Sequence, residues 1–325
     1  MSKIKGPPSV TIHVTVKNAE DTIKKCIESL LDLDYPNKQI YVTEAYSTDS
    51  TYEILEQFGN KIKLERVRGN APTAHNYVFE KINSEFITFT DADCIVDKNW
   101  LKNLIKAFVS DDIVAAGGFC KTPEDVNQLQ RLIGIELEDR FHKMPKYVSR
   151  LPTMNLCVRT KIAKKVRMDE TLDVTFETDW GNRLTRFGKM VYVPNAVVYH
   201  YHRPTLLSYF KQQFRYGKYV IKRPSTYVKL NKFGDYLSKP IMGLQLIVFN
   251  LFLISLITYL LSLSPLLFLF ALLLSIGLLL LFFFDAMSFS RNMYDYYTYP
   301  FLFLIRTLAW TLGMAIGILD VIRSK

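Results

Sequence analysis

The sequence predicts an α/β fold, a doubly wound and mostly parallel sheet, followed by C-terminal transmembrane helices. Two observations lead to this prediction. Strand-like and helical stretches alternate over the first third of the chain, which is typical of a sheet with helices on both faces. Further along, residues 241–284 contain no charged side chain, whereas one membrane span needs only about 20 apolar residues.

The first strand and the first helix show the two periods clearly. Residues 10–16 have valine or isoleucine at every second position, and the apolar residues from Ile23 recur at helical spacing. The elements expected next are a strand at 39–43, a helix at 47–58, a strand at 62–67, a helix at 73–82, a strand at 86–90, a helix near 98–108 and a strand at 113–118. After them we expect a helix over 124–142, a looser segment at 151–160, a helix around 179–187, and strands near 191–193 and 197–201.

Composition and motifs argue against several classes of protein. The chain has 325 residues, of which 49% are apolar, so it needs no disulfide or metal to fold and is not a disordered chain. Its four cysteines have neither a C-x-x-C nor a zinc spacing and are interpreted as reduced residues of a cytosolic domain. The sequence contains no G-x-G-x-x-G after the first strand and no P-loop, which argues against those nucleotide sites.

The net charge of +10 is concentrated beside the apolar segment. Residues 202–240 contain nine Lys or Arg and one Asp. A basic cluster next to a span is typical of the cytoplasmic side and of contact with anionic lipid, and we expect no nucleic-acid partner. Residues 1–8 have no apolar signal sequence. We therefore expect a multi-pass protein of the cell membrane whose first 240 residues are cytosolic.

These patterns divide the chain into three predicted domains. They are a cytosolic α/β domain over 1–202, a basic interfacial helix and linker over 203–240, and a membrane domain over 241–325. In the membrane domain, spans are expected at about 241–262 and 265–284, because a Ser-Leu-Ser-Pro turn separates them.

A third span is expected over 301–319, where Gly313 and Gly317 offer a small-residue face for close helix packing. Arg306 would then have to snorkel to the interface. The alternative is a helix that lies along the interface, because a third span would move Arg323 and Lys325 to the far side of the membrane.

A pair of acids, Asp91 and Asp93, directly follows the apolar run 86–90. Ligands bind beyond the carboxyl ends of the strands in such sheets, and two carboxylates on a tight turn there could hold Mg²⁺ or Mn²⁺ against a diphosphate. Asp32 and Asp34 have the same spacing, but they follow a helix and are interpreted as a turn.

Three further motifs precede this pair in a recognisable order. Glu44 ends the second strand, Ser47-Thr48-Asp49-Ser50-Thr51 comes next, and Ala74-His75-Asn76 follows the third strand. Together with Asp91 and Asp93, this pattern resembles the catalytic domain of glycosyltransferase family 2, over about residues 9–220. The resemblance implies a GT-A fold, a nucleotide-sugar donor and a divalent metal, Mg²⁺ or Mn²⁺.

The resemblance also implies roles for individual residues. Glu44, in place of the usual Asp, would contact the base or the ribose. Asp91 would contact the ribose or the metal, and Asp93 the metal. Asp49 and Asn76 would help to bind the donor.

Later motifs extend the resemblance to the acceptor side. The family commonly has an acidic pair a few residues before R-L, and its Asp is the catalytic base. Here Glu177 is the first choice for the base and Asp179 the second, although both could be acids that stabilise a helix N-terminus. Gln212, Arg215 and Tyr216 resemble the Q-x-x-R-W motif of polymer-making members and would contact the acceptor or the diphosphate.

His200 matches a position that is often His in the family and could complete the metal shell, or it could be an ordinary hydrogen-bonded residue. We therefore expect an inverting, membrane-anchored glycosyltransferase that acts at the cytosolic face. Its acceptor would be a membrane-held polyprenyl phosphate or lipid-linked glycan. The alternatives are a processive polysaccharide synthase, for which oligomerisation would have to complete the channel, and a non-catalytic scaffold.

Overall fold

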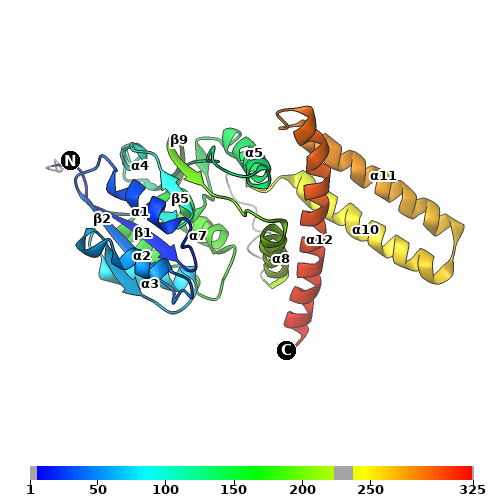
Figure 1. The fold of residues 1–325 in the computed structure, drawn as a ribbon, viewed down its shortest axis with the longest axis horizontal. Coiled ribbons are helices and arrows are strands. Elements are labelled where there is room, and N and C mark those ends of the chain that lie inside the picture. The colour runs from blue at the N-terminus through cyan, green and yellow to red at the C-terminus, as the bar shows by residue number, and fades with distance from the viewer. Residues whose placement is uncertain (1–5, 223–236, 324–325) are drawn as a thin grey trace. The chain divides into compact units, whose positions relative to one another are not determined.

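The computed structural model describes residues 6–222 and 237–323 (Figure 1). These residues form two compact units, each described here by itself. Unit 1 contains 6–126 and Arg140–His202, and unit 2 contains Asn127–Asp139, 203–222 and 237–323. Most of helix α5 (Gln128–His142) therefore belongs to unit 2, whereas the sequence had placed it inside a 1–202 domain.

Unit 1 is built on one mixed sheet. Its strands are β1 (Val10–Val16), β2 (Lys38–Glu44), β3 (Lys63–Arg66), β4 (Phe86–Asp91), β5 (Cys94–Val96), β6 (Ile113–Lys121), β7 (Tyr147–Val148), β8 (Leu156–Arg159) and β9 (Lys189–His200). The order is β3-β2-β1-β4-β8-β6-β9-β5, with β7 also paired to β9. The first four strands of this order are parallel, and β8 joins β4 to β6 in antiparallel pairings. The predicted α/β class is confirmed.

The helices of unit 1 lie between the strands in sequence, as predicted. They are α1 (Ile23–Leu31), α2 (Thr51–Glu56), α3 (Ala71–Lys81), α4 (Trp100–Lys106), α6 (Thr160–Val166) and α7 (Phe176–Leu184). Helix α1 buries Ile23, Cys26, Ile27 and Leu30, which lie on one helical face. Helix α3 begins at a side-chain cap, because Asn70 Oδ1 accepts from Thr73 N at 3.1 Å.

The two strands predicted near 191–193 and 197–201 are one strand, β9. Its register against β6 shifts between Gly118 and Phe119, whose partners are Val193 and Val197. The extra residues include Pro194, which has no N–H to donate to a ladder. The chain therefore bulges and continues the same strand.

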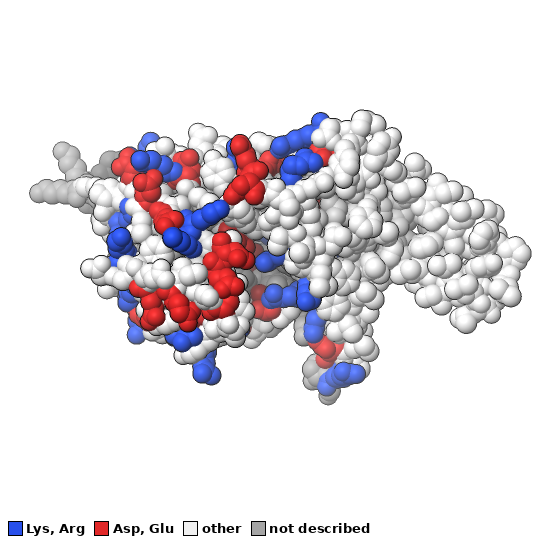
Figure 2. Space-filling model, in the orientation of Figure 1, with Lys and Arg blue, Asp and Glu red and all other residues white. Residues whose placement is uncertain are grey.

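The helices of unit 2 include α8 (Leu206–Lys222), α10 (Pro240–Ser262), α11 (Pro265–Met287) and α12 (Met293–Arg323). The last three are long and apolar enough to cross a membrane, with mean hydropathies of 2.2, 3.0 and 1.8. Helices α10 and α11 form a hairpin, and the face in view in Figure 2 shows no charged residue over most of its length. Helix α12 begins eight residues before the predicted 301 and includes Pro300.

Glycines hold α8 and α12 together at close range. A Cβ at Gly317 would lie 2.5 Å from the carbonyl oxygen of Lys218, and one at Gly313 would collide with the backbone of Phe214. Gly217 meets the backbone of Trp310 in the same way. The predicted small-residue face on α12 therefore does pack a helix, and the helix is α8.

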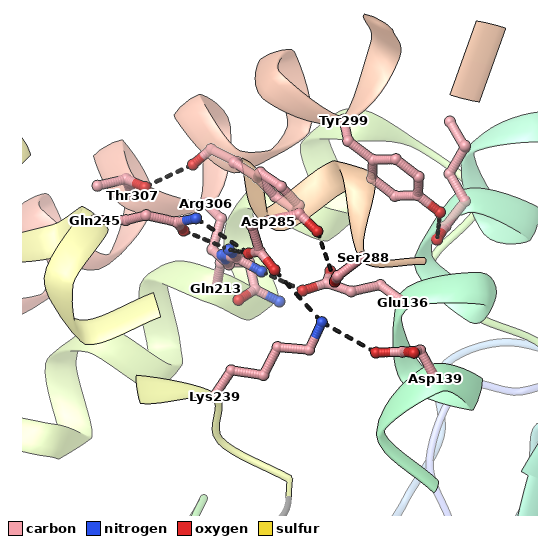
Figure 3. A network of polar contacts seen from close by, with 12 residues as sticks. Glu136, Asp139, Gln213, Lys239, Gln245, Asp285, Ser288, Tyr299, Arg306 and Thr307 are labelled. Atoms are coloured by element: carbon pink, nitrogen blue, oxygen red, sulfur yellow. Dashed lines mark hydrogen bonds and ion pairs between the residues drawn. The ribbon is translucent and has the colours of Figure 1, made fainter. Parts of the chain in front are cut away.

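A network of buried ionic and polar side chains joins α5 to the apolar helices (Figure 3). The side chain of Arg306 is 3% exposed, and its Nη1 lies 2.6 Å from Glu136 Oε1. Its Nη2 donates to Gln245 Oε1 at 2.9 Å, and Asp285 lies 3.9 Å away. The sequence did not indicate this partner: a carboxylate on α5 pairs with the Arg306 guanidinium inside unit 2.

The glycine contacts generate a stability prediction. We expect Gly313→Leu to lower the unfolding midpoint of unit 2 in detergent, because overpacking a close contact costs about 1–3 kcal/mol. Gly277→Leu on α11 is the matched control, since a Cβ there meets nothing within 4 Å. The control should be as stable as the parent or slightly more stable. Equal midpoints for the two variants would contradict the close packing of α8 on α12.

Candidate active site

The carboxyl ends of β1, β2, β3 and β4 meet at one edge of the sheet. Val16 pairs with Glu44, Thr15 with Asp91 and Glu44 with Arg66 in the strand register. Two of the acids singled out in the sequence, Glu44 and Asp91, therefore lie at the same edge. This is the place where open parallel sheets bind ligands.

Glu44 is held by two neighbours. Its side chain is fully buried, one oxygen accepts the N–H of Ser47, and the other lies 2.8 Å from Arg66 Nε. Burial raises the pKa of Glu44, but the donors from Ser47 and Arg66 outweigh burial, so the net pKa is below its usual value. Glu44 is therefore an ionised acceptor at the strand ends.

An aromatic and guanidinium cluster beside Glu44 was not found from the sequence. The guanidinium of Arg66 lies 4.3 Å from the ring centre of Tyr46 and 4.4 Å from that of Tyr52, and Arg68 lies 4.6 Å from Tyr46. Tyr46 is 40% exposed and has a positive φ of 54°. A non-glycine residue in that conformation is uncommon, and this was not visible in the residue pattern. The cluster offers flat faces on which a base could stack.

The Ser47–Thr51 loop is held against the chain that follows β1. Asn18 Oδ1 accepts from Thr48 N at 2.9 Å, and Asp49 accepts from the backbone N–H groups of Thr51 and Glu20 at 3.1 and 3.3 Å. Asp49 therefore acts in this structure as a support for the loop beside the site.

Asn76 is buried and supports a second loop. Its amide exchanges hydrogen bonds with the backbone of Met168, at 2.8 and 2.9 Å, and donates to Glu170 Oε1 at 2.8 Å. Asn70, the cap of α3, donates to the carbonyl oxygen of Glu170. Glu170 is a further residue that the sequence did not single out.

Asp93, Cys94 and His200 form a group that could hold a metal ion. One ligand atom of each lies within 4.8 Å of the others, and His200 Nε2 is 3.4 Å from Asp93 Oδ1. The antiparallel pairing of β5 with β9 sets Cys94 opposite His200. This group does not include Asp91, whose backbone oxygen accepts from Cys26 Sγ at 3.5 Å.

The chemistry of these donors fits a hard or borderline divalent ion. A carboxylate suits Mg²⁺ and Mn²⁺, and an imidazole suits borderline divalent transition ions. Burial by itself lowers the pKa of His200, but Asp93 outweighs it, so this pKa lies well above its usual value, and a bound divalent ion would have to displace the proton that His200 shares with Asp93. Burial raises the pKa of the Cys94 thiol well above its usual value, and a neutral thiol is a poor ligand. Asp93 and His200 are therefore the residues that would hold the ion.

The two candidate bases in the first turn of α7 have different partners. Glu177 Oε1 accepts from the N–H and the hydroxyl of Thr153, both at 2.9 Å. Asp179 pairs with Arg183, with its Oδ2 2.6 and 2.8 Å from two guanidinium nitrogens. Asp179 is thus bound to a cation one turn away, whereas the partners found for Glu177 are neutral.

The three predicted acceptor residues lie on α8 in unit 2. Gln213 and Gly217 face α12, since Gln213 Oε1 accepts from Trp310 Nε1 at 2.9 Å. By the helical period, Gln212, Arg215 and Tyr216 lie on the other side of α8. Arg215 and Tyr216 are exposed.

Two buried histidines lie under the sheet edge. His75 Nδ1 is 3.0 Å from His13 Nδ1, and His13 Nε2 is 2.8 Å from Thr43 Oγ1. Burial lowers the pKa of His75 to about 3, and burial together with His75 lowers the pKa of His13 as well. The pair is neutral in the folded protein near pH 7.

A family model described as glycosyl transferase family 2 matches residues 11–176, just over half of the chain. The protein therefore belongs to glycosyl transferase family 2. The glycosyltransferase AglE of Haloferax volcanii is 24% identical over 225 residues, which cover 65% of this chain and 72% of AglE. The glycosyltransferase GlyA of Streptococcus pneumoniae is 27% identical over 104 residues, 31% of this chain and only 15% of GlyA.

A solved structure shows the same fold over nearly the whole chain. It is the mannosyltransferase PcManGT from Pyrobaculum calidifontis in complex with GDP-Man and Mn²⁺. Its TM-score is 0.60 at 15% identity, and the match covers 96% of this chain and 88% of that one. The predicted GT-A fold with C-terminal apolar helices is confirmed.

The metal group generates a prediction. We expect Asp93→Asn to abolish turnover and to weaken binding of Mn²⁺, measured by electron paramagnetic resonance with a nucleoside diphosphate present, because a carboxamide is neutral. Asp34→Asn is the matched control, since Asp34 ends the other D-x-D and pairs with Lys102. Unchanged Mn²⁺ binding by Asp93→Asn would contradict the assignment.

The histidine pair generates a prediction on pH. Its lowered pKa means that the unfolded chain takes up protons below about pH 6.5 that the folded chain does not. The free energy of unfolding therefore loses nothing from this pair above that pH, and it decreases as the pH falls from about 6.5 toward 3. We expect His75→Asn to reduce this loss by about 1.4 kcal/mol per pH unit between pH 6 and 4. The fluorescence of the buried Trp100 and Trp180 can follow unfolding, and equal slopes in parent and variant would contradict the assignment.

Proposed function

We propose that the protein is an inverting glycosyltransferase that moves a sugar from a nucleotide-sugar donor to a membrane-held acceptor at the cytosolic face. The observation that carries this proposal is the metal-type pair of Asp93 and His200 beside the strand ends where Glu44 and Asp91 lie. Family membership supports the reaction class, and the three long apolar helices support a membrane location.

The donor nucleotide would lie along the sheet edge. The ionised Glu44 can accept hydrogen bonds from a base or a ribose, and the exposed ring of Tyr46 can stack on the base. Mg²⁺ or Mn²⁺ held by Asp93 and His200 would neutralise charge that develops on the leaving diphosphate. Asp49 and Asn76 would support the two loops beside this site.

The transfer itself exchanges one carbon–oxygen bond for another. An acceptor oxygen attacks the anomeric carbon, and the bond from that carbon to the diphosphate oxygen breaks with its electron pair leaving on the nucleoside diphosphate. Attack opposite the leaving group inverts the anomeric centre. When the acceptor is a hydroxyl, its proton passes to Glu177, which is bound to neutral donors, and not to Asp179, which is paired with Arg183.

A donor and acceptor screen tests the function. Purified protein in lipid is given UDP- and GDP-sugars with Mn²⁺, together with polyprenyl phosphate or a lipid-linked glycan, and the lipids are analysed by mass spectrometry. The expected result is a lipid heavier by one sugar with an inverted anomeric centre. Hydrolysis of the donor alone, with no sugar on any lipid, would contradict a membrane-held acceptor, and a retained anomeric centre would contradict the single-base mechanism.

Glu177 provides a prediction that also separates the two acceptors. A glycan hydroxyl must lose a proton, whereas the phosphate of a polyprenyl phosphate is already ionised near pH 7. We expect Glu177→Gln to lose about 10²–10⁴-fold in rate with a glycan acceptor, and much less with a polyprenyl phosphate. Donor binding should be unchanged in both cases. If Asp179→Asn is inactive and Glu177→Gln is active on a glycan, the assignment of the base is wrong.

A further inference from the structure

Helix α12 has the length and hydropathy of a span, but the first half of the helix contacts a helix that is rich in charge. Arg131 of α5 pairs with Asp295, and Glu136 of α5 pairs with Arg306. Tyr299 donates to a backbone carbonyl of α5 at 2.9 Å. These contacts occupy three turns of the face that α12 turns toward α5.

The second half of α12 also packs against a helix with charged side chains, α8. Lys218 Nζ lies 2.8 Å from Asp320 Oδ2, and the glycine contacts at Gly313 and Gly317 join the two backbones. The contacts advance together along both helices, so α8 and α12 run in the same direction. A polar or amphipathic helix therefore accompanies α12 over most of its length.

The hairpin meets α12 only near the open end of the hairpin, among the contacts found in the described part of the chain. Gln245 and Asn250 of α10 bond to Arg306 and Thr311 of α12, and Phe282 of α11 packs against α12. Figure 1 shows the rest of the hairpin extending away from this crossing, with α5 and α8 on the opposite side of α12. Helix α12 thus has α8 on one side and the hairpin on the other, and α5 contacts both α12 and the open end of the hairpin through Leu132 and Ile135.

Electrostatics decides between the two placements of α12. If α12 crossed the bilayer, its close packing with α8 would draw Lys211, Arg215 and Lys218 into the hydrocarbon. A charged residue at the centre of a spanning helix costs about 2.5–3.5 kcal/mol on insertion scales. If α12 lies along the interface, these cations stay among water and lipid headgroups.

The surface of α12 also fits an interfacial position. Most of the residues that contact α5 or α8, including Asp295, Tyr299, Arg306, Gly313 and Gly317, are buried, and the opposite face is an apolar stripe along the whole helix. The stripe contains Tyr297, Phe301, Leu304, Leu308, Leu312, Leu319 and Ile322, which are 38–63% exposed. A helix with one apolar face and one polar-packed face is typical of the membrane interface.

We propose that α12 is not a third span, and that α5, α8 and α12 form a platform on the bilayer surface while the α10–α11 hairpin crosses the membrane. The partner of the platform is the lipid surface, with the apolar stripe in the outer acyl region and the basic face of α8 among anionic headgroups. The proposal requires that the hairpin spans the membrane, and it does not depend on the identity of the donor or the acceptor.

Cysteine labelling tests this topology directly. The four native cysteines are buried, so an impermeant maleimide should not label the parent protein in sealed vesicles. Three single variants are compared: Val109→Cys in unit 1, Leu263→Cys at the hairpin turn and Ile322→Cys near the end of α12, all at exposed positions. No candidate span of the described residues separates Val109 from α10, so Val109 marks the face at which α10 begins.

We expect Ile322→Cys to be labelled from the same side as Val109→Cys, and Leu263→Cys only from the other side. Labelling of Ile322→Cys together with Leu263→Cys would overturn the proposal, because α12 would then be a span. Labelling of all three from one side would also overturn it, since the hairpin would not cross. Detergent should make all three reactive, which checks that each variant is accessible.

Depth along α12 provides a second measurement. A fluorophore is placed at Phe301→Cys, Leu312→Cys or Leu319→Cys, and quenching by spin-labelled lipids reports its depth. An interfacial helix predicts similar, shallow depths at all three positions. Deepest quenching at Leu312, with shallower values at both other positions, would overturn the proposal even if labelling failed. Neither experiment needs enzyme activity, so their failure is distinct from failure of the proposed reaction.

Discussion

The ion pair between Arg306 and Glu136 is the constraint on which unit 2 depends. A guanidinium that is 3% exposed among apolar helices has lost its water, and removing one partner of such a pair typically costs about 3–5 kcal/mol. The buried guanidinium therefore needs a carboxylate partner, and Glu136 of α5 is that partner. This requirement explains why residues 127–139 belong with the apolar helices even though strands of unit 1 precede and follow them in the chain. Lys239 forms a second link of this kind. It lies 3.2 Å from Asp139 of α5 and 3.4 Å from Asp285 of α11.

The carboxylates of the candidate site also differ in the charge of the groups that contact them. Glu44 and Asp179 each pair with an arginine, which holds the carboxylate in a fixed position. Asp93 faces an imidazole that a metal ion could bind equally well. Glu177 faces only the neutral donors of Thr153 among the described contacts. Four acids that look alike in the sequence therefore have three kinds of partner, an arginine, an imidazole or neutral donors, and this difference supports different roles for them.

The sequence predicted those features that local patterns determine. Alternation at 10–16 and at 86–90 located two central strands, and a strand before Asp91 but a helix before Asp32 separated the two D-x-D pairs. Features that depend on contacts between distant segments were missed. The sequence gives no local sign that Glu136 pairs with Arg306, that Cys94 lies opposite His200, or that Tyr46 has a positive φ. The bulge in β9 resembled a break for the same reason, since only its neighbour β6 holds the two parts in one ladder.

The glycines of α8 and α12 connect the membrane arrangement to the proposed chemistry. Close packing at Gly217 and Gly313 fixes which side of α8 is covered. The side of α8 that turns away from α12 contains Gln212, Arg215 and Tyr216. The reactive oxygen of the proposed lipid acceptor would lie in the headgroup layer, and in the proposed platform α8 would present this side at that depth. A spanning helix would place only a few of its residues there, so the platform offers a physical reason for keeping α12 out of the bilayer.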